Sequence, residues 1–279
     1  MTTTSQAATG QTIDQITSTK VDAVDLEQHV KSMYKAVAED PNDKFHFEMG
    51  RVMAERLGYP AEVLDYIPPA AIDSFAGVGY YFDYAGLHSG ESVIDLGSGS
   101  GMDTFFAAQQ VGKSGRVVGI DMTDEQLDKS NDLLNRSDFE NITYLKGYIQ
   151  AAPCEDESFD AVISNGVINL APDKKKVFKE AARLLKPGGR LALADIVTGS
   201  RLPEGITCDA TLWAACISGA MQQDDYLEAI RNAGFLIQQV RDNPEYHFIS
   251  DSAQGATQKY GVKSISVLAR KADGQFSFI

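Results

Sequence analysis

Short apolar runs alternate with amphipathic segments through the middle of the chain. Five runs are rich in apolar residues and end at a polar residue or a glycine: 92–96, 116–121, 142–145, 159–164 and 190–195. Segments with apolar residues at helical spacing lie between several of them, at 103–111, 124–136 and 173–185. Buried strands that alternate with helices predict a mostly parallel sheet with helices on both faces.

The N-terminal part has a different pattern. Apolar residues recur at helical spacing from Leu26 to Val37, so residues 22–66 are expected to be mainly helical. The pair Pro68-Pro69 is expected to end this region. Residues 70–90 are rich in glycine and aromatic residues and are expected to form a connection to the sheet.

These patterns predict the organisation of the chain. Residues 1–20 are a polar tail that we expect to be disordered, 21–90 form an N-terminal helical cap, and 91–279 form the α/β domain. Within that domain a helical insertion at about 200–232, with its helix near 207–232, precedes two more strands at 235–241 and 262–269. The expected fold is Rossmann-like, with a mostly parallel sheet whose last strand is antiparallel.

Charge and composition narrow the partners. The chain has 25 Lys and Arg against 39 Asp and Glu, a net charge of −14, which disfavours nucleic acid and anionic membranes. No apolar stretch approaches the roughly 20 residues of a membrane span, and the N-terminus does not resemble a signal peptide. Three cysteines without a CxxC pair fit reduced thiols, so a cytoplasmic location is expected. The four histidines show no metal-ligand spacing, so no metal is expected.

A glycine-rich loop follows the first strand and opens a helix. It contains Asp95, Gly97, Ser98, Gly99 and Gly101. Glycines let the backbone approach a ligand closely, although a tight turn without a ligand would use them too. The third glycine comes one residue too early for the dinucleotide fingerprint. The acidic Asp95 would repel a pyrophosphate but would suit an ammonium, and S-adenosylmethionine carries an ammonium, a sulfonium and no phosphate.

Asp121 ends the second strand. Its carboxylate can accept both hydroxyls of a ribose, or it can cap the following helix. Met122 can lie against an adenine or fill the core.

Four ordered motifs resemble those of class I S-adenosylmethionine-dependent methyltransferases: 93–101, 118–121, 159–165 and 184–190. A closer resemblance, over roughly 68–235, is to the arsenite methyltransferase family. It rests on the segments 75–79, 119–127, 146–149, 163–170 and 209–220. The resemblance implies cofactor contacts at the glycine loop, Asp121, Met122, Tyr148 and Ile149, and a substrate pocket beside Asn165, which would also contact the cofactor.

The chain departs from that family at its arsenic ligands. The family is expected to hold arsenic with three cysteine thiolates, but this chain has Val78 and Gly166 at two of the positions and only Cys216 at the third. A soft ion needs several thiolates. Cys208 cannot replace a missing one, because eight helical residues separate it from Cys216 by roughly 12 Å. A buried, inert role stays open for each of these cysteines and for Cys154.

The sequence therefore predicts methyl transfer from S-adenosylmethionine to a small soft nucleophile, a thiol or sulfide. Asn165, Gly166 and Cys216 are the candidates beside this small-molecule acceptor. Arsenite methylation and transfer to a small oxygen or nitrogen acceptor stay open. A nicotinamide oxidoreductase and a cofactor-binding regulator without catalysis are the hypotheses from other classes.

Overall fold

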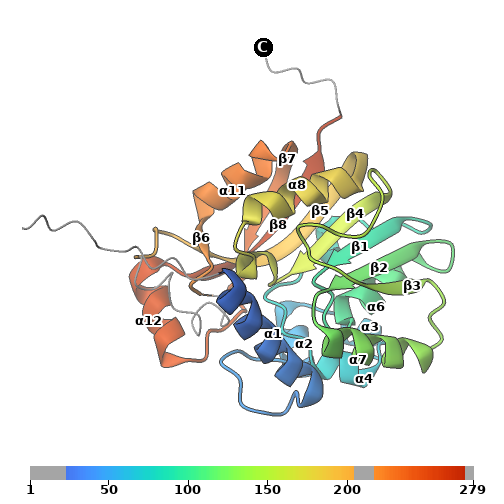
Figure 1. The fold of residues 1–279 in the computed structure, drawn as a ribbon, viewed down its shortest axis with the longest axis horizontal. Coiled ribbons are helices and arrows are strands. Elements are labelled where there is room, and N and C mark those ends of the chain that lie inside the picture. Colours follow the sequence, from blue (N-terminus) through green and yellow to red (C-terminus); the bar gives the residue numbers. More distant parts are fainter. Residues whose placement is uncertain (1–22, 204–216, 274–279) are drawn as a thin grey trace, which may run out of the picture.

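A twisted sheet forms the centre of the protein, which we describe from a computed structural model over residues 23–203 and 217–273. Its eight strands in these residues follow the order β3-β2-β1-β4-β5-β8-β7, with β6 paired to β5 (Figure 1). Their bounds are β1 Ser92–Leu96, β2 Arg116–Asp121, β3 Ile142–Lys146, β4 Phe159–Asn165, β5 Leu185–Thr198, β6 Met221–Gln222, β7 Phe235–Asp242 and β8 Lys263–Lys271.

The strand directions match the expected fold class. β1 to β5 run parallel to one another, whereas β8 is antiparallel to both β5 and β7. The last strand is therefore the reversed one, inserted beside β5. This arrangement confirms the prediction of a Rossmann-like, mostly parallel sheet with an antiparallel last strand.

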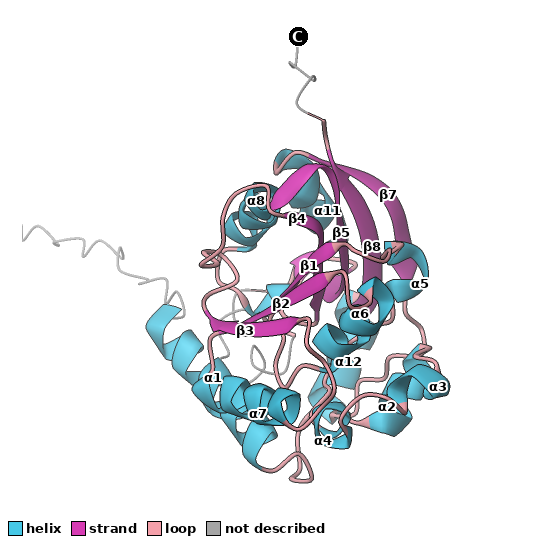
Figure 2. Ribbon diagram, turned by 90° about the vertical axis from the view of Figure 1, so that its right-hand side faces the viewer, coloured by secondary structure: helices cyan, strands magenta, loops and turns pink. Residues whose placement is uncertain are grey.

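Helices cover both faces of the sheet (Figure 2). On the face of α6 lie α7 and most of the N-terminal helices, and α1 packs along α7; α8 and α11 cover the opposite face. The helices are α1 Ala23–Glu39, α2 Arg51–Leu57, α3 Ala61–Leu64, α4 Pro69–Asp73, α5 Phe82–Ala85, α6 Met102–Val111, α7 Asp124–Asn135, the 3-10 helix η1 Ile168–Leu170, α8 Lys174–Leu184, α11 Gln223–Asn232 and α12 Asp251–Tyr260.

The buried side chains of the strands divide between two hydrophobic cores, one on each face of the sheet. Val93 of β1 belongs to the core that contains Phe105 of α6, while its neighbour Ile94 belongs to the core that contains Phe178 of α8. Successive side chains of a strand point to opposite faces. The continuous apolar runs of the sequence therefore reflect burial on both sides.

Two expectations for the N-terminal region are corrected. Pro68 and Pro69 begin helix α4 instead of ending a helix, because proline is well tolerated in the first helical turn, where its missing N–H needs no partner. Residues 40–50 are not helical, and the expected connection at 70–90 contains α5.

The C-terminal half also differs in detail. Of the helix expected over 207–232, the structure shows α11. Residues 221–222 form strand β6, and residues 204–216 lie outside the described residues. Helix α12 was not predicted. The Pro-Gly-Gly segment after Lys186 lies inside β5, where the register with β4 shifts, instead of forming a separate turn.

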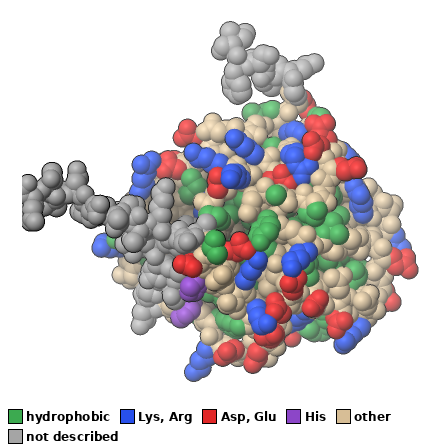
Figure 3. Space-filling view, viewed as in Figure 1, with side chains coloured by type: hydrophobic (Ala, Val, Ile, Leu, Met, Phe, Trp, Pro, Cys, Tyr) green, Lys and Arg blue, Asp and Glu red, His purple; other side chains and the backbone are tan. Residues whose placement is uncertain are grey.

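The helices of the described residues can be compared with a membrane span in length and hydropathy. No helix in the described residues is long and apolar enough to cross a bilayer. Acidic and basic side chains are interspersed over the face viewed in Figure 3.

Candidate active site

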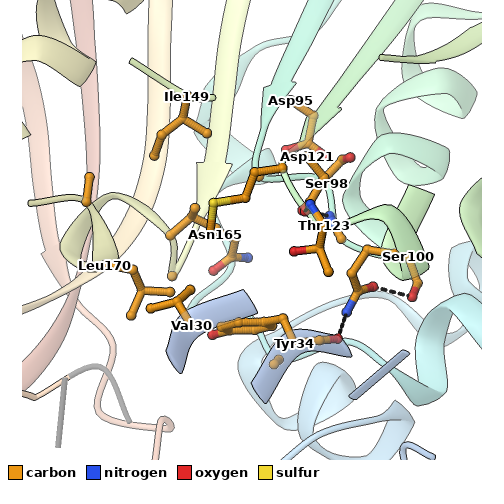
Figure 4. Close-up of a pocket in the computed structure, with 18 of the residues that line it drawn as sticks. Val30, Tyr34, Asp95, Ser98, Ser100, Asp121, Thr123, Ile149, Asn165 and Leu170 are labelled. Atoms are coloured by element: carbon orange, nitrogen blue, oxygen red, sulfur yellow. Dashed lines mark hydrogen bonds between the residues drawn. The ribbon is translucent and has the colours of Figure 1, made fainter. Parts of the chain in front are cut away.

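A cavity of about 350 Å³ lies at the carboxyl edge of the sheet. The ends of β1, β2 and β4 contribute Asp95, Asp121 and Asn165 to its lining, and α1 contributes Val30 and Tyr34. Figure 4 shows Asp95 and Asp121 together on one side, with Val30 across from them. Parallel strands end at the same edge, so residues far apart in the sequence meet here.

The glycine loop forms one wall of the cavity, and its conformation requires glycine. Gly97, Gly99 and Gly101 all have positive φ, at 83°, 53° and 98°. A Cβ added at Gly97 would lie 2.5 Å from the side chain of Val167, which also lines the cavity. A side chain at these positions would therefore strain the backbone and, at Gly97, collide with Val167, so the loop keeps its conformation only with glycine.

Asp121 anchors this loop to the end of β2. Its Oδ2 accepts a hydrogen bond from the Gly99 N–H at 3.0 Å, and its Oδ1 accepts one from the Thr123 N–H at 2.9 Å. These bonds go to the loop and to the residue that precedes α7, so Asp121 does not cap that helix. Burial raises the pKa of the carboxyl group. A carboxylate has about four lone-pair directions, so both oxygens can still accept a ribose hydroxyl.

Asp95 lies beneath the loop and is 2% exposed. Its Oδ2 accepts a hydrogen bond from the Thr104 hydroxyl at 2.7 Å. Burial, and then the neighbouring charge of Asp103, raise the pKa of Asp95 well above its usual range. Two buried carboxyl groups thus share this end of the cavity.

Asp103 was missed by the sequence analysis. It lies in the first turn of α6, lines the cavity and is 5% exposed. It accepts hydrogen bonds from the hydroxyls of Tyr59 at 2.6 Å and Tyr81 at 3.1 Å. Burial raises its pKa to about 6, against the lowering effect of its hydrogen-bond donors. Its position two residues after the glycine loop was the available signal, but its tyrosine partners lie in a distant segment.

Asn165 connects the end of β4 to the 77–79 segment, which lies between Tyr59 and Tyr81 in the sequence. Its Nδ2 donates to Asp103 at 2.9 Å and to the Gly79 carbonyl at 3.0 Å, and its Oδ1 accepts from the Val78 N–H at 2.8 Å. Both ends of the amide are thus engaged within the protein. Asn165 lines the cavity as predicted, but its hydrogen bonds are those of a positioning residue that holds the 77–79 segment in place.

The predicted acceptor side is apolar. Phe75, Gly77 and Leu170 line the cavity there, next to Gly166. A Cβ added at Gly166 would lie 3.2 Å from Cγ1 of Val78, so these two positions are neighbours in space. The family resemblance implied this proximity, because both positions correspond to ligands of one arsenic. Spacing alone could not show it, because 87 residues separate Val78 from Asn165.

Three further residues of the cavity lining were predicted to contact the cofactor, and for Met122 the predicted contact is the adenine. Met122, Tyr148 and Ile149 all line the cavity. The hydroxyl of Tyr148 donates to Glu27 of α1 at 2.8 Å, so α1 is linked to this wall.

The structure brings almost all of the predicted site residues to one cavity: Asp95, Gly97, Ser98, Gly99, Gly101, Asp121, Met122, Tyr148, Ile149, Asn165 and Gly166. Cys208 and Cys216 lie outside the described residues. Cys154 is half-buried against the core below α8 and is not part of the cavity lining. No group of three or more His, Cys, Asp or Glu side chains within 23–203 and 217–273 is arranged to hold a metal.

The residues present fit S-adenosylmethionine. The Ser98 hydroxyl is buried and has no hydrogen-bond partner among the described residues. No Lys, Arg or His from those residues lines the cavity, whereas Glu27, Asp95, Asp103 and Asp121 do. An acidic cavity disfavours a phosphate-bearing dinucleotide and suits a cation that carries a ribose.

Comparison with known proteins gives the same class. A methyltransferase domain model matches residues 87–234. An arsenite methyltransferase of Halobacterium salinarum is 40% identical over 199 residues, 71% of this chain and 51% of that protein. One from Aquipseudomonas alcaligenes is 43% identical over 175 residues, 60% of this chain and 50% of that protein. The chain thus spans about half the length of these curated relatives.

Among solved structures, an arsenic(III) S-adenosylmethionine methyltransferase from Chlamydomonas reinhardtii is similar, with a TM-score of 0.62 and 31% identity. The match covers 82% of this chain and 76% of that one. The chain therefore belongs to the methyltransferase domain family, in the class I group that uses S-adenosylmethionine. Its similarity to arsenite methyltransferases bears on the acceptor, which the family alone does not define.

Proposed function

We propose that this protein transfers the methyl group of S-adenosylmethionine to a small soft nucleophile, a thiol or sulfide. When bound, the cofactor supplies an electrophilic methyl group on a positively charged sulfur. In this proposal Asp121 and the glycine loop hold the nucleoside part, Met122, Tyr148 and Ile149 enclose the adenine, and Asp95 faces the cationic end.

One observation carries the choice of acceptor. Val78 and Gly166, which take the places of two arsenic-binding cysteines implied by the family resemblance, lie side by side at the acceptor end. Neither can supply a thiolate, and Val78 is 1% exposed. This end therefore offers no soft ligand for arsenic at either position, and Gly166 lines the cavity without a side chain of its own.

An apolar wall also affects reactivity. Thiolate is the attacking form of a thiol, and excluding water strengthens its attraction to a nearby positive sulfur. The protein then contributes alignment and desolvation, and it needs no covalent nucleophile. Asn165 acts indirectly in this scheme, because it holds the 77–79 segment against the acceptor end.

Arsenite methylation is the second candidate, and it fits about as well. It is favoured by the relatives at 40–43% identity, which are arsenite methyltransferases. The remaining expected ligand is Cys216. In this alternative, arsenite carried by external thiols would supply the ligands that the protein lacks.

A screen of methyl transfer from labelled S-adenosylmethionine tests both. The acceptors are small thiols, sulfide, arsenite with and without added thiol, amines and phenols, and the Asp121→Ala variant is the cofactor-site control. Turnover of thiols or sulfide without arsenite supports the proposal. Faster turnover of arsenite than of any thiol favours the second candidate, and turnover confined to amines or phenols overturns both.

A further inference from the structure

Asp103 is a buried carboxyl group with no Lys, Arg or His paired to it within the described residues. The groups that lower its pKa are three neutral hydrogen-bond donors, Tyr59, Tyr81 and Asn165. A charged group in a poorly solvated site is costly unless it is paired. Asp103 therefore places an acidic group at the cavity wall, where its burial limits the stabilisation that water can give to its charged form.

The three donors also orient the carboxylate. Tyr81 and Asn165 donate to Oδ2, whereas Tyr59 donates to Oδ1. With about four lone-pair directions on a carboxylate, Oδ1 keeps one direction free. Asp103 also lines the cavity. A ligand group that donates to Oδ1 would complete the hydrogen bonding of this carboxylate.

The position of Asp103 in the cavity indicates which part of a bound cofactor it would contact. It neighbours Asp95 of β1 and Asn165 of β4, while Asp121 lies on β2. The sheet order places β1 between β2 and β4. If Asp121 holds the ribose, Asp103 and Asp95 lie toward the amino-acid end of the cofactor, which carries an ammonium.

We propose that Asp103 is a second binding residue for the ammonium of S-adenosylmethionine, beside Asp95, and that Tyr59, Tyr81 and Asn165 hold its carboxylate in place. The inference rests on the cofactor and not on the methyl acceptor. A charge-assisted hydrogen bond at a buried site supports an affinity effect of about tenfold or more.

Calorimetry without any acceptor separates this role from a structural one. Two ligands are compared: S-adenosylhomocysteine, which has the ammonium, and 5′-methylthioadenosine, which lacks the whole amino-acid part. In Asp103→Asn the dissociation constant of S-adenosylhomocysteine should rise about tenfold or more, while that of 5′-methylthioadenosine changes less than about twofold. Asp132→Asn, the same charge change on exposed α7, should alter neither.

A second variant tests the orientation of the carboxylate. Tyr81→Phe removes one donor and should raise the pKa of Asp103 above about 6, so binding of S-adenosylhomocysteine should begin to weaken at a higher pH than in the wild type. The groups that face Asp103 and titrate or hydrogen-bond with it are Tyr59, Tyr80, Tyr81, Asp95 and Asn165. Tyr81→Phe leaves Asp95 in its place beside the carboxylate.

Three results would overturn the assignment. Equal weakening of both ligands in Asp103→Asn would show that the residue only shapes the cavity. Unchanged binding of S-adenosylhomocysteine would exclude an ammonium contact. Coincident pH profiles for the wild type and Tyr81→Phe would show that Asp103 is not the titrating group. None of these results depends on the acceptor, so they leave the proposed thiol chemistry untouched.

Discussion

The two ends of the cavity are built in different ways. The cofactor end consists of backbone and carboxylates at the ends of neighbouring strands, with Asp95 and Asp121 on β1 and β2. The acceptor end is lined by residues of segments 75–77 and 166–172, which come from different parts of the chain and are linked through the hydrogen bonds of Asn165. The first end is defined by local sequence, and the second by tertiary packing, so changes at each should have separable effects.

The largest effect should come from the glycine loop. Gly97→Ala forces a side chain into positive φ and places its Cβ 2.5 Å from Val167, so cofactor affinity should fall more than about 100-fold. Calorimetry with S-adenosylhomocysteine measures it. Gly234→Ala is the matched control, because Gly234 also has positive φ but has no atom within 4 Å of the added Cβ. Equal losses in both variants would mean that general destabilisation is the cause.

The protonation state of a thiol acceptor should determine how turnover depends on pH. A free thiol with a pKa of about 8.5 is about 1% thiolate at pH 6.5 and half thiolate at pH 8.5, so turnover should rise about 50-fold over that range. Asp103, with a pKa of about 6, is already mostly charged there and adds little. A thiol of lower pKa should move the rise to lower pH. A flat profile with chemistry rate-limiting contradicts the thiolate hypothesis.

Removing the Asp121 carboxylate should weaken only the cofactor end. In Asp121→Ala the loss of the charged acceptor should cost about 2 kcal/mol, or about 30-fold in affinity for S-adenosylmethionine. Part of the loss would come from the freed Gly99 and Thr123 N–H groups. Calorimetry at neutral pH measures the change, with Asp124→Ala on the exposed surface for comparison. Unchanged affinity would remove Asp121 from the site.

The smallest effect should come from thiolates added at the acceptor end. Val78→Cys combined with Gly166→Cys puts two sulfur atoms at adjacent positions, and arsenite binding should rise about tenfold. The gain is limited because Gly166 has a φ of 71°, which strains any other residue. Val78→Ser with Gly166→Ser carries the same strain without thiolates. Efficient arsenite turnover by the unchanged protein would show that its missing thiolates are not needed.

The sequence predicted which residues meet at the proposed cofactor end because its signals are local. The glycine loop, Asp121 and Met122 each follow a buried strand, and the sheet rule brings such residues together. The strands β1 and β2 were predicted with their observed bounds for the same reason, since burial on both faces leaves continuous apolar runs.

The rest depended on contacts that no local pattern contains. Asp103 is held by Tyr59 and Tyr81, which are 44 and 22 residues away, so its role could not be found from spacing. The hydrogen bonds from the Asn165 amide to the 77–79 segment could not be found from spacing either, and its catalytic role stays a prediction. The short helices α4 and α5 were missed because tertiary packing, and not periodicity, stabilises such short elements.

The single amide that joins β4 to the 77–79 segment has a consequence for how acceptor choice can change over time. Asn165 fixes the backbone of Val78 through its N–H, and it leaves the side chain at that position unconstrained by the bond. A mutation at Val78 can therefore change the packing against Gly166 of the cavity wall, while the ends of β1 and β2 keep their geometry. Single substitutions at such positions would allow acceptor choice to change in evolution without loss of the proposed cofactor site.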